Sequence, residues 1–452
     1  MRAIFESFGA QRLQVAALSI QRANPVTLAN RIVVRAQNTR ISSVFSFGHD
    51  LAKASRMNRL NEAIAQTHTF ILAGGQGERL RDLTLSRPKP AVSFGGMFRI
   101  IDFTLSNALH SGLRHVSMLT QYRHQDLHDY VRDGWSQLWN ESGSRENSLR
   151  CLSPTSGKRY RGTADAVHQN LVLAEAKDAE YVMILSGDHV YHMDYRKLLA
   201  HHLETKAELT IATVPCPVHE ASKFGVVEAS AASRVLGFEE KPASPRALPS
   251  APSHALVSMG VYVFTASALR RVLQRQAEVG GGMDFGRDII PSMIPGGRVF
   301  AHQFNGYWRD IGTIDSLYAA NMDLLDDDAP FDPFANEANP SNPTRHPGLN
   351  ATVCQPVVHP RARVERAMIS AGVAISEDVS IEDSVILPGV RIGKGVRLRR
   401  VIVEENTEIP DYFQAGFDAD EDAERHTVTQ LGVVLVAQAS ASTRRMPVAA
   451  TA

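Results

Sequence analysis

This sequence has little cysteine and no net charge. Its 452 residues include three cysteines, at Cys151, Cys216 and Cys354. They are odd in number and far apart, so they indicate neither a disulfide framework nor a zinc knuckle, and a reducing compartment is the simplest interpretation. The 48 basic residues balance 48 acidic ones, so the whole chain has no general attraction for nucleic acid or an anionic membrane. An anionic ligand would need a local group of basic side chains.

The sequence also lacks a transmembrane segment, because no apolar run reaches about 18 residues. What is present is an ordinary globular composition, 44% hydrophobic and 21% charged. This composition excludes a disordered chain, a collagen-like fibre and a disulfide scaffold. At roughly 150 residues per domain, the length predicts about three domains, or two of which one is large.

The first 56 residues differ from the rest. They hold eight basic residues against two acidic ones and are rich in serine, alanine and asparagine. This bias is typical of an organellar transit peptide, whereas the apolar core and cleavage site of a secretory signal are missing. Two other interpretations stay open. Residues 1–56 could come from an over-long reading frame whose true start is Met57, or they could be a dispensable extension. We leave them out of the predicted fold.

Residues 57–326 are predicted to form a Rossmann-like α/β domain with a parallel or mixed sheet. Three short apolar runs, at residues 67–73, 116–120 and 181–185, are typical of buried parallel strands. Residues 163–175 have apolar positions at helical spacing. Alternating strands and helices predict a layered sheet. Since ligands of such sheets bind beyond the carboxyl ends of the strands, we expect a site in the loops that follow them.

A different repeat follows a linker at residues 327–348, which begins in a run of three aspartates and continues with prolines and asparagines. Apolar residues then recur every six positions. The series are Ile369, Ile375, Ile381 and Leu387; Val373, Val379 and Val385; and Ile386, Ile392 and Leu398. This period indicates a left-handed parallel β-helix with one hexapeptide per side of each triangular coil, although plain hairpins remain an alternative. We predict roughly three coils over residues 349–435, which need a surface to stack on, and a flexible tail over residues 436–452.

A glycine-rich loop follows the first predicted strand. Leu72-Ala-Gly-Gly-Gln-Gly-Glu-Arg-Leu80 has three glycines in four positions, which would let backbone N–H groups approach a polyphosphate. It matches neither a Walker loop nor the dinucleotide fingerprint, so alone it is equally consistent with a structural turn. Arg79 ends the loop, and Lys89 follows between two prolines that stiffen the chain. Such a lysine can act as a point charge for a phosphate, the alternative being an ordinary solvated lysine.

Two aspartates far apart in the sequence lie in predicted loops. Asp188 follows the strand at residues 181–185, and Asp310 lies in Tyr-Trp-Arg-Asp-Ile-Gly-Thr. A carboxylate just past a buried strand suits a hard cation such as Mg²⁺, and a helix or turn cap is the structural alternative. Asp188 and Asp310 could share one ion if the fold brought them together. Lys241, in Phe-Glu-Glu-Lys-Pro, ends another predicted strand.

The order of these motifs resembles one enzyme family. The motifs are Gly74-Gly-x-Gly-x-Arg-Leu80, Arg87-Pro-Lys-Pro90, Phe94-Gly-Gly-x-x-Arg-Ile-Ile-Asp102, Tyr160-Arg-Gly-Thr-Ala-Asp165, Gly187-Asp-His189, Glu240-Lys-Pro242, Ser258-Met-Gly260 and Tyr307-Trp-Arg-Asp310. Over about residues 67–435 the chain resembles the bacterial glucose-1-phosphate adenylyltransferases (ADP-glucose pyrophosphorylases) of the sugar-nucleotidyltransferase superfamily.

The resemblance implies a reaction and a cofactor. The family joins ATP and α-D-glucose 1-phosphate, releasing pyrophosphate and ADP-glucose for glycogen synthesis. The sugar phosphate attacks in line, so positioning and charge neutralisation suffice without a protein nucleophile. By resemblance Arg79, Lys89 and Asp188 would be catalytic, and Asp188 and Asp310 would bind Mg²⁺. Implied ATP contacts are Leu72, Ala73, Gly74, Gly75, Gly77, Gln121 and Gly162; implied glucose 1-phosphate contacts are Tyr160, Gly225, Glu240, Lys241, Ser258 and Asp284.

The resemblance also implies regulation by sugar-phosphate activators and by AMP, phosphate or ADP, in a basic pocket between two domains. The matching arginines are Arg87, Arg99, Arg399 and Arg400. Departures from well-known enteric members are Ser86 for lysine, Ser93 for histidine, and Glu424 and Val428 for arginines. We therefore expect fructose 1,6-bisphosphate to activate weakly or not at all. Glu78 replaces the usual threonine or serine, and an acid there would repel phosphate unless it pointed away.

Three functional hypotheses remain. They are the adenylyltransferase, a nucleotidyltransferase of another base such as a thymidylyl or guanylyl enzyme, and a non-catalytic regulatory subunit. Loss of Lys89, Asp188 or Asp310 would have favoured the regulatory subunit, and all three are present. An acyltransferase on the β-helix would need a histidine on a coil loop, and the candidate is His359, at the very start of the repeat. The resemblance further implies a cytoplasmic homotetramer whose partners are small molecules, neither nucleic acid nor a membrane.

Overall fold

The structure is a computed structural model that describes residues 42–141, 148–154, 159–172, 178–326, 329 and 355–441. The chain divides into two units, residues 1–61 and 62–452. Helix α3 (Ser42–Ala65) continues across the domain boundary predicted after residue 56. Residues 1–41 of the predicted leader, the predicted linker except residue 329, Cys354, and the tail beyond residue 441 lie outside the described residues.

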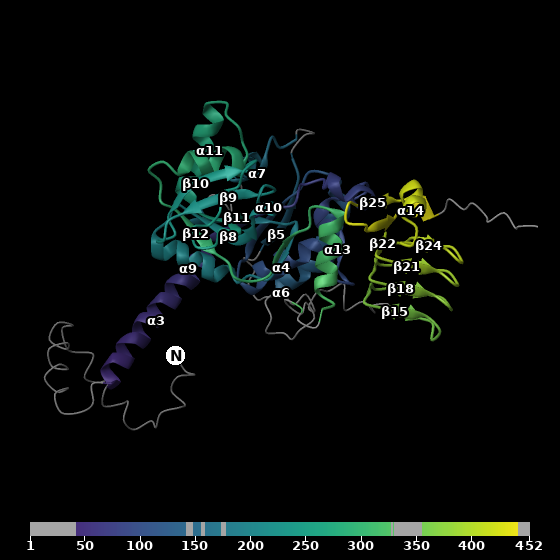
Figure 1. Cartoon of the computed structure of the whole chain (residues 1–452). Helices are drawn as coiled ribbons and strands as arrows, with labels where there is room; N and C mark the ends of the chain where they lie inside the picture. Colours follow the sequence, from purple (N-terminus) through teal and green to yellow (C-terminus); the bar gives the residue numbers. More distant parts are fainter. Residues whose placement is uncertain are drawn as a thin grey trace, which may run out of the picture. The chain divides into compact units, whose positions relative to one another are not determined.

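In the described part of the second unit, a nine-stranded mixed sheet has the order β10-β9-β11-β6-β1-β4-β5, with β8 beside β11 and β12 beside β8 (Figure 1). The strands are β1 (Thr67–Leu72), β4 (His115–Leu119), β5 (Ser148–Leu152), β6 (Tyr181–Ser186), β8 (Leu209–Pro217), β9 (Gly225–Ala229), β10 (Val235–Glu240), β11 (His254–Thr265) and β12 (Val299–Gln303). Strands β5, β4, β1 and β6 are parallel, whereas β11 is antiparallel to β6. The strands predicted from the sequence are β1, β4 and β6, so the expected α/β sheet is confirmed.

Helices cover both faces of this sheet. Figure 1 shows α7 (Thr163–Asn170) and α11 (Ala266–Glu278) on one side, and α4 (Ile100–His110) and α9 (Tyr195–Thr205) on the other. Successive side chains of a strand point to opposite faces. Phe70 of β1 packs with residues of α7 and α11 on one face of the sheet. The next residue, Ile71, points to the opposite face, where it lies near Gly187 together with Ile101 of α4. The helix predicted over residues 163–175 ends at Asn170 among the described residues.

The remaining described elements are short. The helices are α5 (Gln125–Tyr130), α6 (Ser136–Glu141), α10 (Val218–Ala221), α12 (Ile290–Met293), α13 (Ile314–Asp323), α14 (Ala419–Arg425) and α15 (Gln438–Ala441). The 3₁₀ segments are η3 (Glu78–Thr84), which is kinked at Arg81, and η4 (Lys89–Ala91), and the π-helical segments are η5 (Val131–Trp135) and η7 (Phe285–Ile289). Two small sheets pair β2 (Ser93–Phe94) with β3 (Phe98–Arg99) and β7 (His189–Tyr191) with β13 (Trp308–Asp310). Among the described residues, no helix combines the length and the hydropathy needed to cross a membrane, and Cys151 and Cys216 are free thiols.

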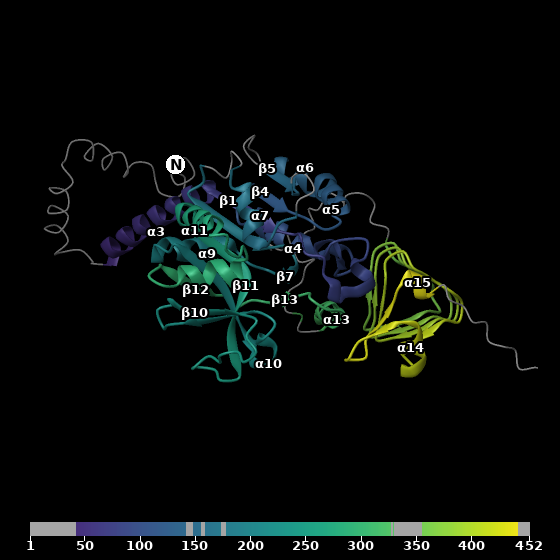
Figure 2. The ribbon, with the colours of Figure 1, turned by 90° about the horizontal axis from the view of Figure 1, so that it is seen from above.

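Described residues after 355 form the predicted β-helix, whose coils have three sides (Figure 2). The sides are the sheets β14-β17-β20-β23, β15-β18-β21-β24 and β16-β19-β22-β26, with β25 added antiparallel to β26. The strands are β14 (Val357–Val358), β15 (Arg363–Glu365), β16 (Met368–Ile369), β17 (Ala374–Ile375), β18 (Ser380–Glu382), β19 (Val385–Ile386), β20 (Arg391–Ile392), β21 (Arg397–Arg399), β22 (Val401–Val403), β23 (Glu408–Ile409), β24 (Gln414–Ala415), β25 (Thr427–Val428) and β26 (Val434–Val436).

The strict six-residue period expected from the sequence is wrong on one side of each coil. Ala374 pairs with Arg391, and Arg391 with Glu408, so one coil takes 17 residues. The inward series is Ile375, Ile381, Ile386, Ile392, Leu398 and Val403, spaced by six, five, six, six and five. The third side of each coil therefore has five residues instead of six. As a result, the inward position that follows Ile381 is occupied by Ile386 and not by Leu387.

The side with the short repeat is buried on both faces. Ile386 and Val403 fill the inside of the coil. Val385 and Leu387 point the other way, into a cluster that includes Leu80 and Phe94 from before the repeat. The short solenoid thus stacks on the α/β domain that precedes it, which meets the expected need for a supporting surface.

Leu387→Ala tests this stacking. Leu387 is 1% exposed, and removing such a side chain lowers the free energy of unfolding by about 2–5 kcal/mol. Thermal and urea unfolding would measure the loss, with Leu431→Ala as the matched control because Leu431 is 66% exposed. Equal effects of the two substitutions would contradict a buried contact at Leu387.

Candidate active site

The glycine loop and the segment around Lys89 pack against each other. Gly77 has a φ of 76°, which favours glycine, and a Cβ at this position would lie 2.8 Å from Cβ of Lys89. The backbone N–H of Lys89 donates to the carbonyl of Gly75 at 3.3 Å. Gly75 and Gly77 therefore allow the glycine loop to pack closely against the segment of Lys89. This is the structural alternative that the sequence left open for the loop.

A short strand pair brings the two predicted metal ligands together. Strand β7 begins at His189 and pairs antiparallel with β13, so that Asp310 lies opposite His189. Asp188 directly precedes β7. Residues 122 positions apart in the sequence thereby share one site, which no spacing in the sequence could predict.

Lys89 lies between these carboxylates. Its Nζ is 2.9 Å from Oδ2 of Asp188 and 2.6 Å from Oδ1 of Asp310, and its side chain is only 7% exposed. Burial acts to lower the pKa of Lys89, but the two carboxylates outweigh it, so that the pKa is raised above its usual value. Burial likewise acts to raise the pKa of Asp188, but Lys89, His189 and the Ser186 hydroxyl hold that pKa well below its usual range.

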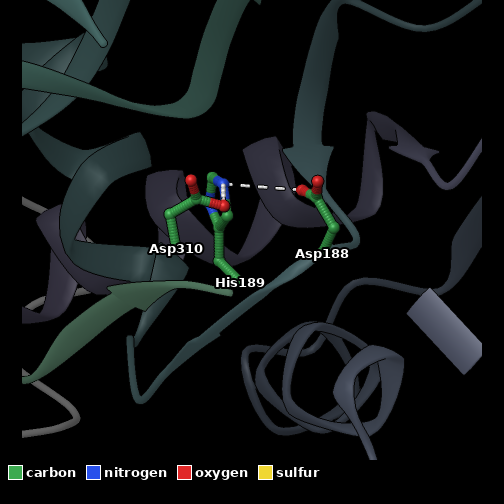
Figure 3. Close-up of side chains that lie close together, drawn as sticks. All are labelled: Asp188, His189 and Asp310. Atoms are coloured by element: carbon green, nitrogen blue, oxygen red, sulfur yellow. Dashed lines mark ion pairs between the residues drawn. The ribbon is translucent and has the colours of Figure 1, made fainter. Parts of the chain in front are cut away.

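His189 is the third member of the cluster, between Asp188 and Asp310 (Figure 3). The indole Nε1 of Trp308 donates to its Nδ1 at 3.3 Å, so in the neutral ring Nε2 carries the hydrogen. This Nε2 lies 3.4 Å from Oδ1 of Asp188 and 3.7 Å from Oδ1 of Asp310. The protonated nitrogen has no lone pair for a metal, whereas the carboxylate oxygens are hard ligands that suit Mg²⁺.

A cavity of about 350 Å³ adjoins Asp188. Of the predicted site residues, its lining includes Leu72, Gly74, Gly75, Gln121, Tyr160, Gly162, Asp188 and Asp284. The Oε1 of Gln121 accepts the backbone N–H of Tyr160 at 2.6 Å, so the amide NH₂ is the end available to a ligand. A Cβ on Gly162 would lie 2.3 Å from the carbonyl oxygen of Met283, which explains why glycine is needed there.

Asp284 has a structural task at the edge of this cavity. Its Oδ2 accepts the Thr163 hydroxyl at 3.0 Å, and its Oδ1 accepts the backbone N–H of Gly286 at 3.0 Å. These bonds cap the turn η7 and join it to the start of α7. If Asp284 contacts the sugar as predicted, its carboxylate is already held in position by these hydrogen bonds.

A second cavity, of about 360 Å³, is lined by Asp310 together with Arg79, Lys223 and Trp308. A Cβ on Gly312 would lie 2.9 Å from Nη2 of Arg79 and 2.8 Å from Oδ2 of Asp310. Arg79 and Asp310 thus approach the same point, although Arg79 itself is exposed. The neighbouring Glu78 begins η3 and is also exposed.

Four predicted sugar-side residues line neither cavity: Gly225, Glu240, Lys241 and Ser258. Gly225 lies opposite Glu240 in the β9–β10 pair, and a Cβ there would lie 2.9 Å from Oε2 of Glu240. The Nζ of Lys241 is 3.4 Å from Oε1 of Glu240, and its side chain is 56% exposed. The Oγ of Ser258 accepts the backbone N–H of Gly260 at 3.2 Å, within a bulge of β11 that faces Ser186.

The four predicted regulatory arginines have separate partners. Arg87 forms an ion pair with Glu405. Arg99 is 2.8 Å from Asp126 and stacks over the ring of Tyr130. On the β-helix, Arg399 and Arg400 lie over the rings of Phe417 and Tyr318, respectively. Within the described residues, the contacts of these arginines do not join them into one cluster.

Sequence reasoning missed the roles of His189, Trp308 and Glu405. His189 directly follows Asp188, and Trp308 stood within a quoted motif, so both were available as signals. Glu405 had none, because its partner Arg87 is 318 positions away. Contacts of this kind are set by the docking of the β-helix, which a single sequence does not reveal.

Comparison with known proteins gives two family matches. A nucleotidyl transferase family model matches residues 68–327, and the model described as "GlmU-like, C-terminal hexapeptide" matches residues 335–436. Glucose-1-phosphate adenylyltransferase 2 of Vibrio cholerae serotype O1 is 41% identical over 395 residues, covering 82% of this chain and 97% of the relative. Proteins named glucose-1-phosphate adenylyltransferase in Nitrosospira multiformis and Methylobacillus flagellatus are 40% and 41% identical, each covering 86% of this chain and 96% of the relative.

Metal binding tests the carboxylate pair directly. Mn²⁺, a paramagnetic substitute for Mg²⁺, should bind the protein, and Asp188→Asn or Asp310→Asn should weaken binding at least about tenfold, because each removes a negatively charged oxygen ligand. Electron paramagnetic resonance of free Mn²⁺ gives the dissociation constant. Asp133→Asn, at a carboxylate that is 67% exposed, is the control. Unchanged Mn²⁺ affinity in both site variants would remove the metal from this position.

Proposed function

The chain belongs to the family of the glucose-1-phosphate adenylyltransferases, and from this membership we propose how its cleft carries out the reaction. The enzyme is a nucleotidyltransferase that joins ATP and α-D-glucose 1-phosphate into ADP-glucose and pyrophosphate. A phosphate oxygen of the sugar attacks the α-phosphorus of ATP. The bond from that phosphorus to the bridging oxygen of the β-phosphate breaks, and pyrophosphate leaves with the electron pair.

The observation that carries this proposal is the ion cluster of Lys89, Asp188 and Asp310. Two polyanionic substrates must approach each other, and two unit charges about 4 Å apart repel by about 4 kcal/mol at an effective dielectric constant of 20. Fixed charges that need no reorganisation lower this barrier. No protein nucleophile is required, because the sugar phosphate is itself the nucleophile.

Asp188 and Asp310 are the residues that would hold Mg²⁺, whose charge, when the ion is bound, draws the phosphates together and neutralises them. Lys89 meanwhile keeps the two carboxylates at a fixed separation. We assign its Nζ to donate to an oxygen of the α-phosphate as negative charge develops there. A buried lysine that is already paired retains its proton, which this role requires.

We propose that ATP binds in the cavity beside Asp188. We assign the triphosphate to the backbone N–H groups of the glycine loop (residues 73–77) and to Arg79, and the adenine to Gln121 and Gly162. The support is that Gly74 and Gly75 of the loop line one cavity with Gln121 and Gly162, whereas Arg79 lines the cavity beside Asp310. The NH₂ of Gln121 can donate to an adenine ring nitrogen, and Gly162 lines the same cavity.

The sugar phosphate is assigned to the edge formed by β9, β10 and β11. Lys241 would bind its phosphate, and Glu240, Ser258 and Asp284 its hydroxyl groups. Lys241 has a φ of 52°, and its backbone N–H donates to the carbonyl of Phe224 at 3.0 Å. Because the side chain of Lys241 is half exposed and its backbone is held by this hydrogen bond, the amino group can change rotamer and bind a phosphate.

Several expectations stay predictions. Weak activation by fructose 1,6-bisphosphate is supported by the pairing of Arg87 and Ser93 with Glu405, which occupies both side chains. The cytoplasmic location, the homotetramer and the roles of Arg99, Arg399 and Arg400 rest on the resemblance. A nucleotidyltransferase of another base is the remaining alternative for the substrate.

An activity panel tests the substrate. Purified protein is incubated with glucose 1-phosphate, Mg²⁺ and each of ATP, UTP, GTP and dTTP, and the nucleotide sugar and pyrophosphate are quantified. ADP-glucose should be the main product. Asp188→Asn should reduce turnover by about two orders of magnitude or more, because it removes a charge from the reacting centre. Preference for another nucleotide would reject adenylyl transfer.

Lys241→Gln tests the sugar-phosphate assignment. A hydrogen bond to a charged group contributes about 1.5–3 kcal/mol, so the KM for glucose 1-phosphate should rise at least about tenfold while the KM for ATP changes little. Arg246→Gln is the control, since Arg246 is 73% exposed and pairs with Glu228. Equal increases in both KM values for Lys241→Gln would show that the role is misassigned.

A further inference from the structure

One carboxylate of the β-helix binds both ends of the segment that carries Lys89. Glu405 lies in the turn between β22 and β23. Its Oε2 pairs with the guanidinium of Arg87, and its Oε1 accepts the hydroxyl of Ser93 at 2.6 Å. Lys89 lies between these two contacts, so Glu405 closes a short loop with Lys89 inside it.

The chain between the contacts is stiff. Pro88 and Pro90 flank Lys89, and each proline ring fixes φ at its own position and restricts the residue before it. Within the loop, the backbone N–H of Val92 donates to the carbonyl of Lys89 at 3.1 Å, which forms the turn η4. A displacement of Arg87 or Ser93 is therefore transmitted to Lys89 rather than absorbed by the chain.

The contact is well suited to hold a position. The side chain of Glu405 is 13% exposed and that of Arg87 20% exposed, so solvent and salt screen the pair weakly. The guanidinium and the hydroxyl are two donors converging on one anion. Bonds between charged partners of this kind are stronger and more directional than neutral ones.

We propose that Glu405 is a positioning residue for Lys89: the β-helix, through this carboxylate, fixes the 87–93 segment so that the amino group of Lys89 stays aligned with the reacting phosphates. The proposal rests on the catalytic role assigned to Lys89 above. It makes the β-helix a working part of the catalytic site, because Arg87 and Ser93 form an anion site that the chain fills with its own carboxylate.

Two variants test this proposal with different geometry. Glu405→Gln keeps the shape and the bond from Ser93 but removes the charge. Glu405→Ala empties the anion site. Both should lower kcat about tenfold or more with smaller changes in KM, because a misplaced catalytic group mainly costs transition-state stabilisation. Glu408→Ala, at an exposed carboxylate three residues away, should leave kcat unchanged.

Added acetate separates positioning from mere stability. At tens of millimolar it should restore kcat of Glu405→Ala toward the normal value by occupying the emptied site between Arg87 and Ser93. It should leave Glu405→Gln unchanged, because the amide fills that space. Normal kcat in both variants would overturn the proposal, as would a reduced kcat in Glu405→Ala that acetate does not raise. If Glu405→Ala does not fold, the kcat of the isosteric Glu405→Gln decides.

Hydrogen–deuterium exchange gives a readout independent of activity. Amides of residues 84–94 should exchange about tenfold faster in Glu405→Ala, and acetate should reverse this. Unchanged exchange would overturn the proposal. If the unsubstituted protein formed no nucleotide sugar while these exchange changes still occurred, the assigned reaction would fail but the role of Glu405 in fixing the segment would stand.

Discussion

The rest of the site depends on one buried lysine held between two carboxylates. Charges removed from water are costly unless they are paired, and removal of one partner leaves the others uncompensated. The glycine loop must therefore come close enough to seat Lys89, and β7 must pair with β13 to bring Asp310 to Asp188. With these contacts made, the charges needed for phosphoryl chemistry are in place before substrate arrives, which is the condition for electrostatic catalysis.

The β-helix contributes more than a repeat attached to an enzyme. On the side with the short repeat, the side chains of Val385 and Leu387 point out of the coil and pack with Leu80 and Phe94 in a shared hydrophobic core. The same docking places Glu405 against Arg87 and Ser93. Ile386, between Val385 and Leu387, points into the coil, so this side of the solenoid is buried on both faces.

The balance of charge shows how a neutral chain can bind polyanions. Of the basic groups assigned to phosphate, Arg79 lies in η3, Lys89 in η4 and Lys241 directly after β10. Lys89 and Lys241 lie next to carboxylates. Paired in this way, they add nothing to the net charge and do not attract anions in general. Selectivity for phosphorylated substrates then comes from geometry, since only a ligand that meets several of these groups at once gains from them.

The sequence by itself determined the two-part architecture and the strands β1, β4 and β6, because apolar periodicity and glycine or proline placement are local properties. It predicted which short motifs carry the chemistry. It also supplied Lys89, Asp188 and Asp310 as separate candidates. Only the tertiary structure decided that these three meet, that Trp308 donates to Nδ1 of His189, that the coil has 17 residues, and that Glu405 closes the loop around Lys89. Each of these depends on strand pairing or docking between residues that are distant in the chain, and the free energy of such contacts leaves no pattern in a single sequence.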